Sequence, residues 1–561
     1  MTEGSTLTSA SKGRPARRVA LAWAALTLGL VAATAPAQGI GRDEGVYLAA
    51  AESYAAFWAE LSSSPAHAIL ASDRFFTLNH EHPALAKEVF GLTHALFSKG
   101  LGLTNHLQGF RFGAFFFAAF LSFLLATAGY DLAGLLGAWL APALFWAVPR
   151  HFYHAHLAAL DLPVTALWLA AVLAYRESER PGISARRAWA FAIATGIAFG
   201  AGLAVKHNAW FLGPLLFVHA LYTRPSSPGT RRYPVPLALV AMGILGPLVF
   251  VASWPWLWHD PIARLQSYFT FHLHHENYSW QYLGHLLREP PFPIEYPFVV
   301  TALTVPAAIL FVYACGFMQG LACLFRPDPP GIGLTVRARP PGDEILLLLN
   351  AFFPLALIAW PTVPHFGGVK HWLPAMPFLA LLGARALVTA GRAIWPRRAA
   401  LVTVTLALFA LVPAIWAVAH IHPYGTAAYN ELAGGAPGAA SLGMERQFWG
   451  DDVVGLLGEV NLHAVPGARV WWQETSAGAV RAWQRDGLVR GDLRWAVGPE
   501  DADLSIWQYH QEFRDKEFRT WTEFAEPARP DRPPRLPRPV AGLYLDEVPL
   551  AVIYARPGAW R

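Results

Sequence analysis

The chain has 561 residues, of which 54% are hydrophobic and 14% charged, whereas soluble domains carry about 25% charged residues. The formal net charge is only +5, and Lys and Arg are scattered along the chain, which argues against a nucleic-acid partner because such proteins gather basic residues on one face. The composition therefore predicts a membrane protein.

Apolar runs long enough to cross a hydrocarbon core of roughly 30 Å recur along the chain, about eleven in all. We expect spans near 19–37, 108–128, 132–149, 156–175, 188–205, 208–222, 235–254, 297–324, 344–361, 372–390 and 399–418. The predicted fold class is therefore mostly α, a polytopic membrane protein. Cys315 and Cys323 fall in one run, about two helical turns apart. This spacing is too long for a disulfide within one helix, so both are expected to pack in the core.

The connections between these spans alternate in charge. One set carries several Arg each: SKGRPARR, YRESERPGISARR, TRPSSPGTRRY, FRPDPPGIGLTVRARPPGDE and GRAIWPRR. The opposite short hairpins hold single cations, Arg150, Lys206 and Lys370. The positive-inside rule then places the N-terminus in the cytoplasm, and an odd number of spans places everything after about residue 419 outside.

This sidedness predicts three regions: a cytoplasmic tail (1–18), a transmembrane domain (19–418) with outer loops at 38–107 and 255–296, and an outer C-terminal domain (419–561). The first apolar segment has a second interpretation. ARRVALAWAALTLGLVAATAPAQG has the basic start, apolar middle and Ala-Pro-Ala end of a cleaved signal peptide. Under either interpretation the residues that follow it emerge on the outer face.

The first outer loop has helical periodicity. EGVYLAAAESYAAFWAEL places Val46, Tyr47, Ala50, Tyr54, Phe57, Trp58 and Leu61 at helical spacing. HPALAKEVFGLTHALF repeats the pattern after a proline, which is favoured at a helix start. Both stretches are typical of amphipathic helices that lie in the membrane interface.

Two acids, Asp43 and Glu44, open this loop in the stretch GRDEGVYLAA. Acids favour helix N-termini, so one explanation is a simple helix cap. A second motif, NHEHPALAK, closes the same loop and combines Glu81, His82 and Lys87. Two polar motifs on one outer loop favour a functional site over a cap alone.

The order of these features resembles the GT-C glycosyltransferases, in particular the protein O-mannosyltransferases and the lipid A aminoarabinose transferase. The matching residues are Asp43, Glu44, Glu81, His82, Pro83, Leu85 and Lys87. Ala84 departs from the family pattern, which has a second Pro there, and His82 stands where the aminoarabinose branch has Lys. The resemblance spans roughly residues 15–420 and implies that Asp43 is the catalytic acid residue.

Two further residues fit the same layout. Asp161 lies at the outer end of a span, as an acid does in the family; a structural salt bridge or a helix cap is the alternative. Lys206 resembles a family lysine that faces the lipid phosphate; the alternative is snorkelling of the side chain to the interface.

The second outer loop opens with aromatic residues and is dense in histidine. Its polar residues include His259, Asp260, His272, His274, His275 and Glu276. Such a cluster could ligate a metal, but no strict ligand spacing is met, and a hydrogen-bonding lining is the other interpretation. We assign no metal site and no cofactor, and a divalent metal stays open.

The implied donor is a sugar on a polyprenyl phosphate. Its leaving group is a phosphate monoester with a second pKa near 6, which needs cations rather than a general acid. The candidate donor-phosphate ligands are Lys206, Lys87, His82, Arg264 and Lys370. Asp43 is the expected base toward the acceptor, with Glu44 and Glu81 as orienting partners or metal ligands. One base implies inversion at the sugar's C1, because retaining enzymes use a second group as nucleophile.

The C-terminal composition is polar. Alternating segments such as ARVWWQET, DLSIWQYH and VPLAVIYAR predict strands of a small α/β domain of about 140 residues, interrupted by a Pro-rich loop, EPARPDRPPRLPRP. Asp451 and Asp452 in WGDD are expected to begin a solvated helix, with a functional role as the alternative.

The predicted function is an inverting transfer of sugar from a polyprenyl-phosphate donor to a protein, lipid or glycan acceptor. The resemblance implies the periplasmic face of a bacterial inner membrane, contact with membrane lipids and no nucleic acid. Two alternatives stay open: a transporter or flippase of lipid-linked glycans, and a ligase or polymerase of undecaprenyl-linked glycans. A transporter predicts charges at mid-span and repeated broken helices, whereas the charges here lie at outer helix ends.

Overall fold

The computed structural model describes residues 9–223, 235–325, 341–510, 514–525 and 535–561. Two of the Arg-rich connections, at 224–234 and 326–340, lie outside the described residues, as do the first eight residues and most of the Pro-rich loop. The charge pattern that predicts which side of the membrane each connection faces therefore lies partly outside the described residues.

Helices dominate the chain up to residue 421. They are α1 (Ser9–Thr34), α2 (Arg42–Ser63), α3 (Pro65–Leu70), α4 (Asp73–Phe76), α5 (Leu85–Thr93), α6 (His106–Trp146), α7 (Pro149–Ala155), α8 (Asp161–Ser178), α9 (Ala185–Leu203), α10 (Leu212–Thr223), α11 (Leu237–Ala252), α12 (Pro261–Leu273), α13 (Tyr296–Thr304), α14 (Ala307–Phe325), α15 (Pro341–Ile358), α16 (Met376–Ile394) and α17 (Ala399–Ile421). A short antiparallel hairpin, β1 (Trp280–Tyr282) with β2 (His285–Leu287), lies in the second outer loop.

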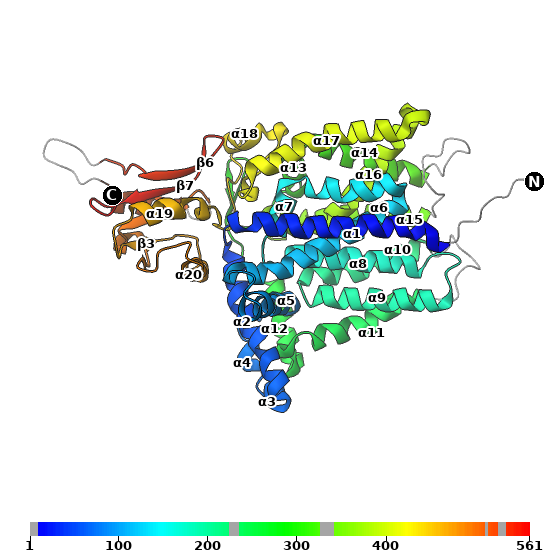
Figure 1. The fold of residues 1–561 in the computed structure, drawn as a ribbon, viewed down its shortest axis with the longest axis horizontal. Coiled ribbons are helices and arrows are strands. Elements are labelled where there is room, and N and C mark those ends of the chain that lie inside the picture. Colours follow the sequence, from blue (N-terminus) through cyan, green and yellow to red (C-terminus); the bar gives the residue numbers. More distant parts are fainter. Residues whose placement is uncertain (1–8, 224–234, 326–340, 511–513, 526–534) are drawn as a thin grey trace, which may run out of the picture.

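The long helices run side by side along the longest axis of the molecule (Figure 1). Each expected span overlaps one of them. α6 covers two expected spans. Its backbone leaves the helical conformation at Ala133 and Gly134, and this kink divides the helix into two halves. The two halves then pack against each other: a Cβ built on Gly129 would lie 2.3 Å from the carbonyl oxygen of Gly137, so this close approach requires glycine.

Among the described residues, five helices are long and apolar enough to cross a membrane by length and composition: Arg14–Ala37, His106–Trp146, Ala307–Phe325, Leu373–Ile394 and Pro396–Ile421. A helix that is apolar all round needs an apolar environment on every side. The chain is therefore an integral membrane protein, while the number of spans, about eleven by length, stays a prediction. Cys315 on α14 is exposed on the helix surface rather than packed in the core as expected, and Cys323 on the same helix is partly buried.

The first outer loop covers one end of the bundle, opposite the N-terminus (Figure 1). Its first predicted amphipathic helix is α2. Tyr47, Ala50, Tyr54 and Phe57 are buried as the periodicity predicts, whereas Val46 and Trp58 of the same predicted set are exposed. The second is α5, followed by a π-helical stretch from His94 to Gly100. The loop is thus a folded platform at the end of the bundle.

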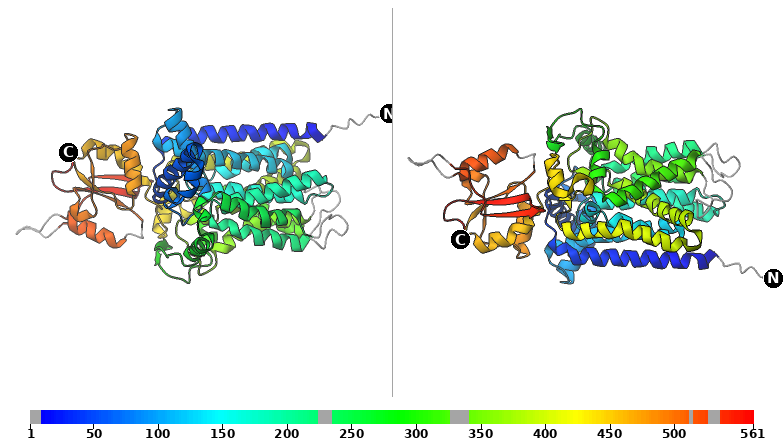
Figure 2. Two further views of the ribbon diagram at one scale, coloured as in Figure 1. Left: turned by 90° about the horizontal axis from the view of Figure 1, so that it is seen from below. Right: turned by 90° about the horizontal axis from the view of Figure 1, so that it is seen from above.

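The C-terminal region forms a compact α/β unit beyond the same end of the bundle (Figure 2). Its elements are α18 (Gly435–Ser441), α19 (Leu457–His463), β3 (Arg469–Trp471), α20 (Ala477–Arg485), β4 (Arg494–Trp495), β5 (Leu504–Gln508), α21 (Arg514–Phe524), β6 (Ala541–Leu545) and β7 (Val548–Ala555). The strand order is β4-β3-β5-β7-β6. β3 pairs parallel with β4 and β5, and β7 pairs antiparallel with β5 and β6. The predicted strands are confirmed at β3, β5 and β7.

This unit is anchored to the helix bundle. The Asp486 carboxylate accepts hydrogen bonds from the backbone N–H groups of His106 and Leu107, at 2.9 and 3.0 Å. A carboxylate at a helix N-terminus satisfies unpaired N–H groups and complements the helix dipole. The C-terminal unit therefore caps α6, the helix that follows the first outer loop.

Candidate active site

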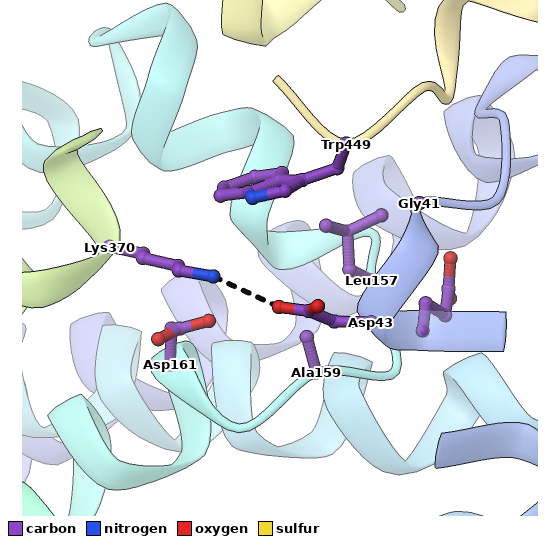
Figure 3. Close-up of a pocket in the computed structure, with 8 residues that line it drawn as sticks. Gly41, Asp43, Leu157, Ala159, Asp161, Lys370 and Trp449 are labelled. Atoms are coloured by element: carbon purple, nitrogen blue, oxygen red, sulfur yellow. Dashed lines mark hydrogen bonds and ion pairs between the residues drawn. The ribbon is translucent and has the colours of Figure 1, made fainter. Parts of the chain in front are cut away.

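Asp43 lies in the first turn of α2, at the end of the bundle that the outer loops cover. Its carboxylate accepts a hydrogen bond from the Lys370 ammonium, with 2.9 Å between Oδ2 and Nζ (Figure 3). The Asp43 side chain is 38% exposed and that of Lys370 only 7%, so the carboxylate faces the open side of the pair. Burial opposes ionisation, but the charges of Lys370 and Arg42 outweigh it and hold the pKa of Asp43 well below its usual range. The carboxylate is therefore ionised at neutral pH and able to accept a proton.

A pocket surrounds this pair and encloses about 250 Å³ of empty space, part of it open to solvent. Its lining residues are Gly41, Asp43, Glu44, Leu157, Ala159, Asp161, Lys370 and Trp449. They come from α2, the segment before α8, the turn before α16 and the start of the C-terminal region. Sequence positions more than 400 residues apart thus meet in one small cavity, as Gly41 and Trp449 illustrate.

Asp161 and Lys206 form a second ion pair at this pocket, with 2.5 Å between Oδ1 and Nζ. Both side chains are buried, at 11% and 10% exposure. The salt bridge considered as an alternative role for Asp161 is therefore present, and it contributes to the pocket wall. Snorkelling of Lys206 into water is excluded, because its ammonium is buried and paired.

The approach of Lys370 to Asp43 depends on the turn that precedes it. Gly367 and Gly368 both have left-handed backbones, with φ of 85° and 62°. A Cβ built on Gly367 would lie 2.5 Å from Cε of Lys370. Glycine is thus needed both for the backbone conformation and for the space into which the lysine folds back.

Glu44 anchors the start of α2 to the helix bundle. Its carboxylate receives 2.8 Å hydrogen bonds from Nε and Nη2 of Arg111 on α6 and from the backbone N–H of Ala158. Arg111 is fully buried and also donates to the carbonyl oxygens of Gln38 and Gly39. Since Asp43 is the neighbouring residue, this clamp also holds the first turn of α2, and with it Asp43, against the bundle.

Lys87 holds the first outer loop together and is not a pocket residue. Its ammonium is fully buried and donates to the carbonyl oxygens of Asn79 and His82 at 2.7 and 2.9 Å, and to Oδ1 of Asn79 at 2.9 Å. Burial lowers the pKa of Lys87 to about 7. The prediction that Lys87 contacts the donor phosphate is therefore not supported, because its donors are used inside the loop. Glu81 accepts a 2.6 Å hydrogen bond from Asn79 in the same network and lies outside the pocket lining.

Three imidazoles gather beside Lys206. The ring of His272 lies 4.3 Å from that of His207 and 5.8 Å from that of His82, between centroids. Burial, the Lys87 charge and the neighbouring His272 and Lys206 lower the pKa of His82 well below its usual value, so this ring is neutral. Within the described part of the chain, Nδ1 of His82, Nδ1 of His207 and Nε2 of His272 have no hydrogen-bond partner. The lysine is thus surrounded by imidazole groups with unused hydrogen-bonding capacity.

The remaining candidates of the second outer loop lie outside the pocket lining. Arg264 makes a two-pronged ion pair with Asp73 of α4, at 2.5 and 2.7 Å, which joins the two outer loops; its predicted phosphate contact is not supported. His259 lies 3.0 Å from Oγ of Ser72 and strengthens the same junction. His274 is exposed, and His275 is partly buried against Phe366; the Nδ1 atoms of both lie within hydrogen-bond distance of nearby backbone carbonyl oxygens.

Sequence reasoning missed the contribution of Trp449, and it misjudged the acids that follow. Asp451 and Asp452 are 1% and 0% exposed, so the expected solvated helix start is wrong. Asp451 accepts a 3.0 Å hydrogen bond from Gln38, and burial raises the pKa of Asp451 to about 7. The order of an aromatic residue, a glycine and two acids was the available signal in the sequence. The burial of these residues, however, depends on docking against a segment far away in the sequence.

No group of three or more His, Cys, Asp or Glu that could hold a metal ion occurs among the described residues. The dense histidines of the second outer loop, considered above as possible metal ligands, lie in different surroundings: His272 packs against His207, His274 is exposed, and His275 stacks on Phe366.

Comparisons with known proteins give structural neighbours only. No family model matches the chain, and no curated protein matches it in sequence. A crystal structure of ArnT from Cupriavidus metallidurans bound to undecaprenyl phosphate covers 95% of this chain and 97% of its own, at 12% identity and a TM-score of 0.48; the apo form gives 13% and 0.49. The archaeal oligosaccharyltransferase AglB from Archaeoglobus fulgidus, in complex with an inhibitory peptide and a dolichol-phosphate, covers 70% of this chain and 55% of its own, at 11% identity and a TM-score of 0.42.

At these identities and TM-scores the likeness determines neither the activity nor the substrate of this chain.

Proposed function

We propose that the chain is an inverting glycosyltransferase that moves a sugar from a polyprenyl-phosphate donor to an acceptor at the outer, periplasmic face of a bacterial inner membrane. One observation carries the proposal. The partly exposed carboxylate of Asp43 is paired with the buried Lys370, and a second buried lysine, Lys206, pairs with Asp161 in the wall of the same pocket, at the end of an apolar helix bundle. This combination supplies a base and cations where a lipid-anchored donor presents its headgroup.

Asp43 is the proposed base. Its oxygen takes the proton from the acceptor nucleophile as that atom attacks the sugar's anomeric carbon, a contribution typically worth 10²–10⁴ in rate. Its lowered pKa keeps it ionised but makes it a weak base. A phosphate group bound near Lys370 partly neutralises that lysine and so raises the basicity of Asp43 when the donor is in place.

Lys206 and Lys370 receive the charge that develops on the leaving phosphate. Preorganised cations in a partly dry site stabilise such charge without reorganisation at the moment of reaction. The N–H groups of His82 and His207 are the proposed additional donors to phosphate oxygens, since their unpartnered Nδ1 atoms lie beside Lys206. Attack opposite the leaving phosphate, with one base, inverts the anomeric configuration.

The membrane location fits the donor's chemistry. The isoprenoid tail is apolar and is accommodated between helices of the bundle, while the sugar phosphate reaches the pocket at its end. A bundle of spans in one orientation, set by the Arg-rich connections, puts that end outside the cytoplasm. The acceptor class is a protein, lipid or glycan, and it enters from the side of the outer loops.

A donor panel tests this function. Purified protein in detergent is offered radiolabelled monosaccharides linked to polyprenyl phosphate, and release of polyprenyl phosphate is measured for the parent, for Lys206→Met and for Lys99→Met. Lys99 is the matched control, because it pairs with Glu52 at the loop surface and is 58% exposed. Release by the parent and Lys99→Met, with loss in Lys206→Met, supports the proposal. Folded parent protein that releases nothing from any donor contradicts it and favours the transporter or ligase alternative.

A further inference from the structure

Trp449 has a backbone conformation that bulky residues rarely adopt. Its φ is 67°, and Gly450 follows with φ of 68°. The left-handed region is unfavourable for L-residues with a large side chain, and such strained residues concentrate at functional sites. The conformation therefore points to a role of the indole ring that offsets this strain.

The indole forms the roof of the pocket. Figure 3 shows it on one side of the Lys370–Asp43 pair, with Asp161 and Ala159 on the other. The Lys370 ammonium lies 4.7 Å from the centroid of the ring. A Cβ built on Gly367 would lie 3.1 Å from Cζ2 of Trp449, so the glycine that admits Lys370 also leaves room for the ring.

The roof is attached directly to the segment that carries the base. The carbonyl oxygen of Trp449 accepts a 2.9 Å hydrogen bond from the backbone N–H of Arg42, the residue before Asp43. Next to it, Gln38 donates to Asp451, and a Cβ built on Gly39 would lie 1.9 Å from the Asp451 carbonyl oxygen. These contacts fix the position of the indole relative to the Asp43 carboxylate, although Trp449 belongs to the C-terminal region.

We propose that Trp449 is the platform for the donor's sugar ring, an inference that rests on the proposed function and deepens it. The anomeric carbon is bonded to the phosphate oxygen that Lys206 and Lys370 hold, so the ring attached to it lies within the pocket that the indole covers. An indole offers a flat apolar face, which fits the C–H face of a sugar. Stacking there places the anomeric carbon between the leaving phosphate and the side from which Asp43 activates the acceptor. The C-terminal region thereby determines part of the donor specificity.

Binding measurements separate a sugar platform from a structural role. The probes are polyprenyl phosphate alone and the same lipid phosphate carrying the monosaccharide that the parent transfers from the panel. Both are titrated against the parent, Trp449→Leu, Trp449→Phe and Trp495→Leu. Trp495 on β4 is the matched control, because it is 43% exposed and does not line the pocket. Thermal unfolding of each variant confirms that it is folded.

We expect Trp449→Leu to weaken binding of the sugar-bearing lipid about tenfold and to change binding of bare polyprenyl phosphate less than twofold. Trp449→Phe keeps an aromatic face and retains most of the affinity, and Trp495→Leu matches the parent. If Trp449→Leu weakens the binding of both probes equally, or of neither, Trp449 is not a sugar platform. The proposed function still stands in that case, provided that the parent transfers sugar. A parent that transfers no sugar from any donor overturns the proposed function and this inference together.

Discussion

The buried pair of Glu44 and Arg111 makes a strong prediction about stability. Glu44→Gln removes the charge but keeps the shape of the side chain, and it leaves the Arg111 guanidinium fully buried without a counter-ion. Removing one partner of a buried ion pair costs about 3–5 kcal/mol. Because Arg111 still donates to backbone carbonyl oxygens of Gln38 and Gly39, we expect the lower part of that range, about 3 kcal/mol.

The assay is thermal unfolding in detergent, followed by the fluorescence of the tryptophans. Glu52→Gln is the matched control, because Glu52 lies on the same helix and pairs with Lys99 at 3.0 Å on the surface. An exposed pair of this kind is worth about 0–1 kcal/mol, so the control should unfold close to the parent.

A double variant sharpens the test. Glu44→Gln with Arg111→Met removes both charges, and apolar replacement of a whole buried pair is often neutral or stabilising. The double variant should therefore be more stable than Glu44→Gln alone. If Glu44→Gln lowers the stability no more than Glu52→Gln does, or if the destabilisation by Glu44→Gln and by Arg111→Met is additive, the ion pair does not hold the start of α2 as described.

Three further predictions concern the outer loops and the C-terminal unit. The pKa of Lys87 falls from its ordinary value to about 7 on folding, so the unfolded state binds more protons than the folded state above pH 7. The free energy of unfolding should therefore rise with pH from about 7 to about 10. In thermal unfolding, Lys87→Met should lose this pH dependence. Asp486→Ala removes the carboxylate that accepts from the N–H groups of His106 and Leu107; it should cost about 1 kcal/mol and speed proteolytic release of the C-terminal unit, whereas substitution of the exposed Asp501 by Ala should not. A cysteine placed at the exposed Thr522 in a cysteine-free chain should react with a membrane-impermeant maleimide on spheroplasts; protection until the membrane is permeabilised contradicts the predicted sidedness.

The bundle and the outer loop were predictable because their signals are local. Apolar runs marked the long helices, and the spacing of Tyr47, Tyr54 and Phe57 marked α2. Asp43 could be singled out for the same reason, since it follows a span directly. Its partner Lys370 was recognised as an outer cation, but their contact depends on the Gly367–Gly368 turn.

The rest of the site depends on packing between distant segments, which leaves no local signal. Lys87 stands in the motif expected to face a phosphate, yet the loop folds around its ammonium. Arg264 was expected to be an outer cation available to a phosphate, but its guanidinium pairs with Asp73 of the first outer loop. Trp449 and the buried acids after it become part of the site only because the C-terminal unit docks onto the segment before α2.

The central claim is that Asp43 acts as the base of sugar transfer, and a single-turnover experiment tests it most directly. Parent, Asp43→Asn and Asp73→Asn are mixed with the donor that the panel identifies and with excess acceptor, and transfer is followed in time while donor binding is measured separately. Asp73 is the control acid, placed in the same loop but paired with Arg264 outside the pocket lining. We predict that Asp43→Asn binds the donor and transfers about 10²–10⁴ times more slowly, while Asp73→Asn keeps the parent's rate. Transfer by Asp43→Asn at the parent's rate contradicts the claim.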